Sequence, residues 1–173
     1  QQHPKADGLS LYREAMRFLT ETTGNRFWAQ KATSYVYYAR EILTSIPDAR
    51  MIYLMRNPFD ICTSSMRRPY EVESIVGRTV GWNGGVRTIE QIASGFPGRI
   101  HIIKYEDLVT DPQPPIEALC TFLGVRFTSE LLEVPHINPS ENHFKVIKGS
   151  KGINTSRLYY YMNVLSRSDI AAV

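Results

Sequence analysis

Cysteine, charge of one sign and long apolar runs are all scarce in this sequence of 173 residues. Two cysteines cannot build a disulfide-rich scaffold or a zinc site of four thiolates, so Cys62 and Cys120 are expected to be small buried hydrophobic residues. The net charge of +3, from 20 basic and 17 acidic side chains, is too small to indicate nucleic acid binding, although it allows a local anion site. No run approaches the roughly 18 consecutive apolar residues of a membrane span.

Several signatures of catalytic sites are missing as well. The 4 histidines show no HExxH or similar spacing, so the sequence does not support a metal site. It contains no GxSxG nucleophile elbow, no GxGxxG dinucleotide loop and no P-loop of the GxxxxGK(S/T) type. We therefore expect no metal cofactor.

What the sequence does contain is typical of a folded domain. Its length matches one domain of roughly 100–200 residues. A hydrophobic content of 43% with 7 Phe, 10 Tyr and 2 Trp argues against disorder. There is no repeat or low-complexity tract, so we predict a single domain over residues 1–173. The sequence begins at Gln1 and stops within a helix start at Ser166, and we expect it to be a fragment of a longer domain.

The pattern of apolar residues predicts an α/β fold. Helices are expected where apolar residues recur at i, i+3 and i+4, and strands where short apolar runs follow turns. Such runs are typical of parallel strands buried on both faces, with helices flanking the sheet. The expected helices are 9–20, 34–46 with Ser34 as its cap, 58–67, segments of 71–94, 116–123, 129–134, 159–165 and one capped by Ser166 or Ser168. The expected strands are 51–55 and 100–103, and 135–157 is expected to be irregular.

The first candidate site is the junction between the strand at 51–55 and the helix at 58–67. Ligands of an open parallel sheet bind beyond the carboxyl ends of its strands, and Arg56 is the first residue after this strand. An arginine beside a helix N-terminus with unpaired N–H groups suits a phosphate, and Ser64 would add a hydroxyl two turns along. Alternatively, Arg56 pairs with Asp60 and Ser64 faces solvent.

Two other basic positions are candidates. Lys31 lies just before an expected helix start, where it would either neutralise a transferring anionic group or be a solvated surface lysine. The stretch 145–157 combines basic residues with glycines and hydroxyls. It is either a segment that closes over a phosphate or a solvated basic loop.

Tyr105 follows the second expected strand directly. Its ring would pack on an aromatic ligand or cover the core. The neighbouring Glu106 and Asp107 are adjacent in sequence and would point apart, so we favour a structural role for them over acid–base chemistry.

Several stretches, taken in order along the chain, form a further pattern. They are WAQKATSY at 28–35, IPDAR at 46–50, IYLMRNPFD at 52–60, YEDLVTDP at 105–112, FLG at 122–124, TSR at 155–157 and the LS…DI ending at 165–170. Together they resemble the sulfotransferases that use 3′-phosphoadenosine 5′-phosphosulfate (PAPS). The resemblance extends from about residue 27 to the end of the sequence.

The resemblance implies a role for each matched residue. Arg56 and Ser64, eight residues apart, match the arginine and serine of the family's 3′-phosphate motif. Lys31 matches a lysine close to the transferred sulfuryl group, Tyr105 a position near the adenine, and Arg157 a segment that closes over the co-substrate. The implied fold is a three-layer α/β structure related to the P-loop kinases, with a parallel sheet flanked by helices. The implied co-substrate is PAPS, without a metal.

Some features depart from the family pattern or stay open. A Pro-x-x-Gly-Thr-Thr-like loop for the 5′-phosphosulfate is absent and is expected upstream of Gln1; Gln30 and Ala32 stand where Glu and Pro are common. A P-loop-related nucleotide kinase or hydrolase and a non-catalytic glycan- or partner-binding relative are the alternatives. The acceptor would be a small molecule or carbohydrate with a hydroxyl or amine, but its identity, the general base and the oligomeric state are not legible. Among compartments the cytoplasm is favoured.

Overall fold

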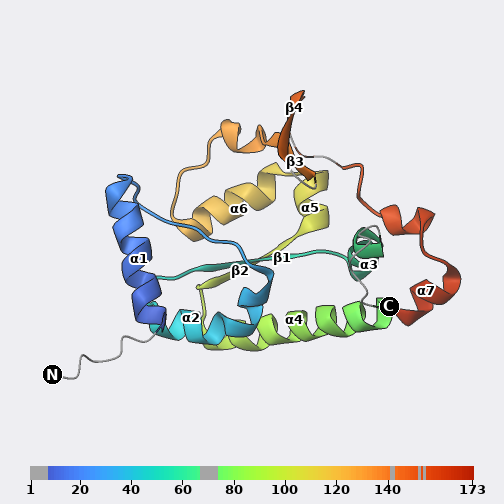
Figure 1. The fold of residues 1–173 in the computed structure, drawn as a ribbon, viewed down its shortest axis with the longest axis horizontal. Helices are drawn as coiled ribbons and strands as arrows, with labels where there is room; N and C mark the ends of the chain where they lie inside the picture. The colour runs from blue at the N-terminus through green and yellow to red at the C-terminus, as the bar shows by residue number, and fades with distance from the viewer. Residues whose placement is uncertain (1–7, 67–73, 141–142, 152, 154) are drawn as a thin grey trace. The chain divides into compact units, whose positions relative to one another are not determined.

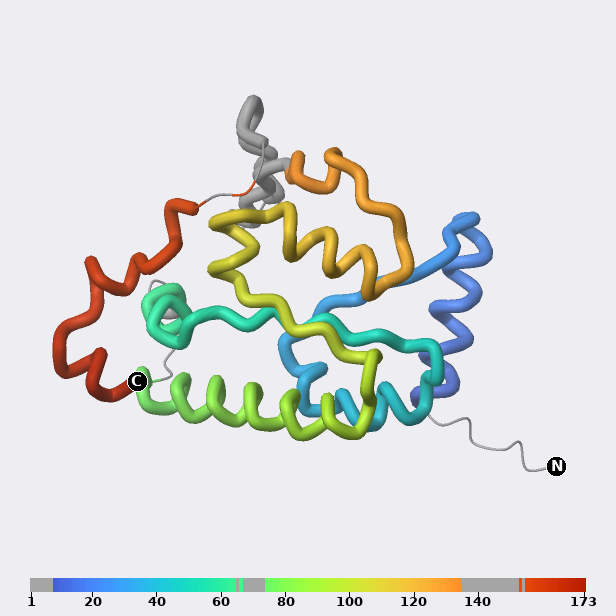
Figure 2. The backbone as a smooth tube through the Cα atoms, turned by 180° about the vertical axis from the view of Figure 1, so that it is seen from behind, coloured from blue at the N-terminus to red at the C-terminus, as the bar shows by residue number. Residues whose placement is uncertain are grey.

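The computed structural model of the chain is drawn in Figures 1 and 2. It describes residues 8–66, 74–140, 143–151, 153 and 155–173. The chain separates into two compact units, Gln1–Ala49 and Arg50–Val173, and the expected single domain stays a prediction. In the described part of the chain, no helix combines the length and the apolar character needed to cross a membrane.

The first unit is helical. Its elements are α1 (Gly8–Thr22), η1 (Thr33–Tyr38) and α2 (Ala39–Ser45). The predicted helix at 9–20 is confirmed, and it ends before Gly24, whose φ of +67° favours glycine. The single helix predicted at 34–46 is wrong in its first half, because η1 is a 3₁₀-helix and Ser34 is not a cap. The run TSYVYY consists of β-branched, aromatic and hydroxyl residues, which are poor helix formers.

The second unit is built on two parallel strands, β1 (Met51–Met55) and β2 (Ile100–Lys104). They pair without stagger, from Met51 opposite Ile100 to Met55 opposite Lys104, so both strands end at the same level. Figures 1 and 2 show α4 along one side of this pair and α5 and α6 on the other. The predicted parallel α/β arrangement is confirmed. The described residues include only these two parallel strands, so the larger sheet of the expected three-layer fold is not seen.

The α3 and α4 helices connect β1 to β2. The α3 helix (Pro58–Met66) confirms the prediction at 58–67. The α4 helix (Ile75–Gly95) is one continuous helix of 21 residues, although its glycines suggested separate segments. One of them packs closely, because a Cβ at Gly85 would lie 3.2 Å from the Tyr53 hydroxyl on β1. The predicted residues 71–73 lie outside the described residues.

Only one of the two faces of β1 is well covered by other described parts of the chain. Ile89 and Ile92 of α4 are buried. Ile103 of β2 is buried as well, but it pairs with Leu54 and therefore lies on the other face of the strand pair. Ile52 and Leu54 point to that other face of β1 and are 44% and 52% exposed, so burial on both faces was wrong for this strand. Both cysteines are free and buried, as predicted.

The remaining elements follow β2. They are α5 (Tyr105–Thr110), α6 (Gln113–Leu123), η2 (Ser129–Leu132), β3 (Pro135–Ser140), β4 (His143–Lys151), η3 (Tyr160–Asn163) and α7 (Arg167–Ala172). The α6 helix begins before the predicted position 116, since prolines are well accommodated in a first helical turn. The prediction of irregular structure at 135–157 is wrong where β3 and β4 pair antiparallel. Pro135 and Pro139 argued against a strand in the sequence, but proline is tolerated in strands at the edge of a sheet.

Candidate functional site

The candidate site begins where the two parallel strands end. Because β1 and β2 end level, Arg56 and Tyr105 follow their last residues side by side, with the Arg56 guanidinium carbon 4.4 Å from the centre of the Tyr105 ring. The backbone N–H of Asn57 donates to Glu106 Oε1 at 2.9 Å, which ties the two strand ends together. Glu106 therefore has the structural role favoured from the sequence.

Asn57 starts α3 as predicted. Its Oδ1 accepts hydrogen bonds from the backbone N–H groups of Phe59 at 2.8 Å and Asp60 at 3.3 Å. The Ile61 N–H donates to the Asn57 carbonyl at 3.3 Å, and Pro58 has no N–H. All backbone donors of this first turn are thus engaged. The expectation that they would be unpaired and available to an anion is wrong, because Asn57 and Glu106 already satisfy them.

A distant segment, residues 157–161, packs against this helix start through Asp60. The two carboxylate oxygens accept backbone N–H bonds from Tyr159 and Tyr161, each at 3.0 Å. The Phe59 and Tyr161 rings are stacked with centroids 4.9 Å apart. These contacts hold Arg157 and its neighbours next to the first turns of α3.

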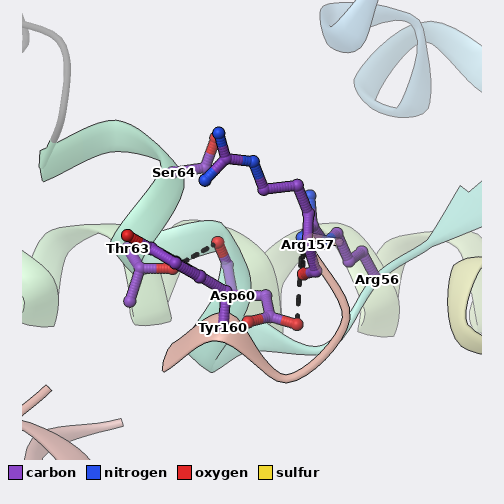
Figure 3. A pocket seen from close by; sticks show the side chains of 6 residues that line it. All are labelled: Arg56, Asp60, Thr63, Ser64, Arg157 and Tyr160. Atoms are coloured by element: carbon purple, nitrogen blue, oxygen red, sulfur yellow. Dashed lines mark hydrogen bonds and ion pairs between the residues drawn. The ribbon is translucent and has the colours of Figure 1, made fainter. Parts of the chain in front are cut away.

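A small pocket lies between α3 and this segment (Figure 3). It encloses about 90 Å³, enough for several water molecules. Its lining is mostly polar and consists of Arg56, Asp60, Thr63, Ser64, Arg157 and Tyr160. In Figure 3 the Arg157 side chain extends toward Ser64. The lining contains two guanidinium groups but only one carboxylate, which is already hydrogen-bonded twice, so the pocket favours an anionic guest.

The Arg56 guanidinium is only partly engaged by the chain itself. A terminal nitrogen donates to the Arg157 carbonyl at 2.8 Å and lies 3.8 Å from Asp60 Oδ2. The Nε atom is buried and has no hydrogen-bond partner among the residues that the structure describes, while the whole side chain is 23% exposed. A buried unsatisfied N–H is costly and rare in folded proteins. The ion pair with Asp60 that the sequence left open is therefore present, but it does not use all of the guanidinium.

The structure brings three of the predicted site residues together, because Arg56, Ser64 and Arg157 all line the pocket. Tyr105 contacts Arg56 and does not line it. Lys31 belongs to the first unit, where it is exposed two residues before η1. The side chains of the basic residues at 145–151 lie outside the described part of the structure.

Sequence analysis missed Thr63 and Tyr160, and it treated Asp60 only as a partner for Arg56. Thr63 is buried and its hydroxyl donates to the Asp60 carbonyl at 3.0 Å. The position of Asp60 one turn after Arg56 was the available signal that these two side chains meet. Nothing in the sequence indicated Tyr160. Among the residues described, there is no group of three or more His, Cys, Asp or Glu side chains that could hold a metal ion.

Comparison with known proteins identifies a family for this chain. A model described as "Sulfotransferase family" matches residues 2–129. The solved sulfotransferase domain from the curacin biosynthetic pathway is similar, with a TM-score of 0.62 and 28% sequence identity over 70% of this chain. The match covers 47% of that domain's chain, so this chain spans about half its length. No curated protein matches. A family model that covers most of the sequence, with a solved relative of the same fold, leads to one conclusion: the chain belongs to the sulfotransferase family.

Proposed function

We propose that this chain is part of an enzyme that transfers a sulfuryl group from PAPS to a hydroxyl or amine acceptor. The observation that carries the proposal is the buried Nε of Arg56, which has no partner in the described part of the chain and belongs to a pocket also lined by Ser64 and Arg157. Membership of the sulfotransferase family supports the reaction class. It also argues against the nucleotide kinase that the sequence left open.

The pocket suits the 3′-phosphate of the donor. Arginine donates through several N–H groups in a fixed fork, and that geometry matches phosphate oxygens. Ser64 of α3 and Arg157 of the facing segment would supply a hydroxyl and a second guanidinium to the same pocket. The backbone N–H groups at the start of α3 would not take part, since Asn57 and Glu106 occupy them. Recognition of the phosphate would thus depend on side chains.

Arg56 and Ser64 would do no bond chemistry. In the transfer, the bond between sulfur and the oxygen of the donor's 5′-phosphate breaks and a bond to the acceptor oxygen or nitrogen forms. The acceptor proton passes to a general base that we do not assign. We propose that Lys31 neutralises charge near the transferred group, as the family resemblance implies. Tyr105 would lie near the adenine, with one face of its ring already covered by Arg56.

Calorimetry with two nucleotides tests the proposal on the full-length protein. Adenosine 3′,5′-bisphosphate is the donor product, and adenosine 5′-monophosphate lacks only the 3′-phosphate. A pocket built for that phosphate is expected to bind the bisphosphate at least about 100-fold more tightly. Equal affinity for both nucleotides would refute the phosphate site, and a preference for ATP would favour a kinase.

Transfer itself is measured separately. Labelled PAPS is offered with a panel of phenols, aliphatic alcohols, amines and carbohydrates, and labelled product is counted. Labelled product with any acceptor class supports the transferase. Tight bisphosphate binding without any transfer would instead identify a non-catalytic relative.

A further inference from the structure

The Asp60 carboxylate forms part of the pocket wall, but its hydrogen bonds go to the chain itself. It is 1% exposed, and each oxygen accepts one backbone N–H from the 157–161 segment at 3.0 Å. A buried carboxylate is strongly destabilising unless it is hydrogen-bonded or paired. These two bonds are therefore what allows the charge to be buried, and they fix the segment that provides them.

The backbone of this segment is shaped around the carboxylate. Tyr159 adopts a left-handed conformation with φ of +52°, and it is the one non-glycine residue with positive φ in the described structure. Side chains with a Cβ rarely adopt this conformation, and it persists where surrounding contacts enforce it. A left-handed residue between right-handed ones turns successive N–H groups toward one point and so forms a concave anion site. Here the anion is the side chain of Asp60.

Arg56 completes the connection from the opposite side. The nitrogen that donates to the Arg157 carbonyl is also the one 3.8 Å from Asp60 Oδ2. The guanidinium that we assign to the 3′-phosphate thus also holds the backbone of the residue that carries the second guanidinium. The two arginines of the pocket come from positions 101 residues apart, and Asp60 contacts the elements of both.

We propose that Asp60 is a positioning residue, which docks the 157–161 segment on α3 and so places Arg157 at the donor's phosphate. The part that concerns the donor rests on the proposed function. Loss of the Asp60 contacts would release the segment, and the bound phosphate would then lose Arg157 as well. Asp60 itself would not touch the donor.

Asp60→Asn is the test variant and Glu106→Gln is its matched control. The asparagine retains one acceptor oxygen, but its NH₂ group cannot accept the second backbone N–H, and the negative charge is gone. Glu106 also accepts a backbone N–H at the same strand–helix junction, yet it does not line the pocket. A general weakening of the junction would affect both variants, whereas a docking role would affect only Asp60→Asn.

Docking is measured first without nucleotide. Trypsin cleaves after Arg157, and mass spectrometry follows that single site in the full-length protein. We expect cleavage about tenfold faster in Asp60→Asn than in the wild type or in Glu106→Gln. The loss of one hydrogen bond to a charged group should make opening of the segment more frequent by about that factor. Equal rates in all three proteins would overturn the proposal.

Tyr159→Asn tests the docking through a change in the 157–161 segment itself. It replaces the first test if Asp60→Asn does not fold. Asparagine adopts the left-handed conformation more readily than tyrosine, so the segment should be held more firmly. Slower cleavage after Arg157 is expected. Unchanged or faster cleavage would count against a docking site that depends on this backbone turn.

The effect on the donor is measured with a double-mutant cycle. Asp60→Asn and Arg157→Ala are each expected to weaken adenosine 3′,5′-bisphosphate binding about tenfold, and the double variant should be no weaker than either alone. In turnover, the KM for PAPS should rise while kcat changes little. Additive losses would mean that Asp60 does not act through Arg157, which would overturn the proposal. If the wild type does not bind the bisphosphate at all, the proposed function fails, and the trypsin result still decides whether Asp60 docks the segment.

Discussion

Replacing Arg56 probes the anion pocket most directly, because its Nε is a buried donor for which the described residues provide no partner. A hydrogen bond to a charged group contributes about 1.5–3 kcal/mol, and an arginine fork makes more than one. We expect Arg56→Ala to weaken adenosine 3′,5′-bisphosphate binding by about 2–4 kcal/mol, or roughly 30- to 1,000-fold. Arg56→Lys keeps the charge but loses the fork, so we expect a loss of about 1–2 kcal/mol.

The same substitution also affects folding. Arg56 lies 3.8 Å from the buried Asp60 carboxylate, which keeps its two backbone hydrogen bonds when the guanidinium is removed. Breaking a fully buried ion pair costs about 3–5 kcal/mol. Because this pair is long and Arg56 is 23% exposed, we expect Arg56→Ala to lower the free energy of unfolding by about 1–3 kcal/mol. Arg56→Lys should lose less.

Calorimetry at a temperature where each variant is folded separates the two effects, and thermal unfolding without nucleotide measures the second. Arg87→Ala is the control, since Arg87 is an exposed arginine of α4 that does not line the pocket. It removes the same charge and should change affinity by less than about 0.5 kcal/mol. If Arg56→Ala binds the bisphosphate as tightly as Arg87→Ala, Arg56 is not a ligand of the phosphate.

Three other substitutions have defined outcomes. Lys31→Ala is expected to lower kcat much more than affinity for the bisphosphate, and equal losses in both would make Lys31 a binding residue only. Gly85→Ala should lower the free energy of unfolding by about 1 kcal/mol, because the new Cβ would lie 3.2 Å from a β1 hydroxyl. Gly81→Ala should raise it by up to about 1 kcal/mol, because a Cβ there has nothing within 4 Å and alanine is the better helix former. Chemical denaturation measures both, and the same sign for both would contradict the packing at α4. The hydrogen bond from the Ser166 side chain lowers the pKa of Asp169, so that this bond stabilises α7 above pH 3.8 and is lost as pH falls through the lowered value. Ser166→Ala should return the pKa of Asp169 toward 3.8 in an NMR titration, and an unchanged pKa would show that the cap does not cause the shift.

The sequence predicted the strand–helix junction well because its signals are local. Five apolar residues gave β1, and Asn57 followed by Pro58 gave the start of α3. From these two elements, the place of Arg56 at the carboxyl end of a parallel strand followed directly. The spacing between Arg56 and Ser64 left two interpretations open, and the family resemblance favoured a shared site; in the structure both residues line one pocket.

What could not be predicted depends on contacts between distant parts of the chain. The bonds from Tyr159 and Tyr161 to Asp60 join residues about 100 positions apart, and a left-handed tyrosine has no sequence signal. Glu106 removes a donor from the start of α3, although it follows a different strand. Composition also misled where prolines interrupt β3 and where aromatic residues form η1, since both patterns are ambiguous over a few residues.

The hydrogen bonds that already occupy the backbone N–H groups in the first turn of α3 have a consequence for the evolution of the pocket. A phosphate site built from main-chain N–H groups is insensitive to most substitutions, because every residue except proline provides the same N–H group. Here Asn57 and Glu106 occupy those amides, and the remaining donors in the described pocket belong to side chains encoded by separate codons. A single base change in a codon can replace each of these side chains, so the anion preference of the proposed phosphate site could change gradually through single mutations.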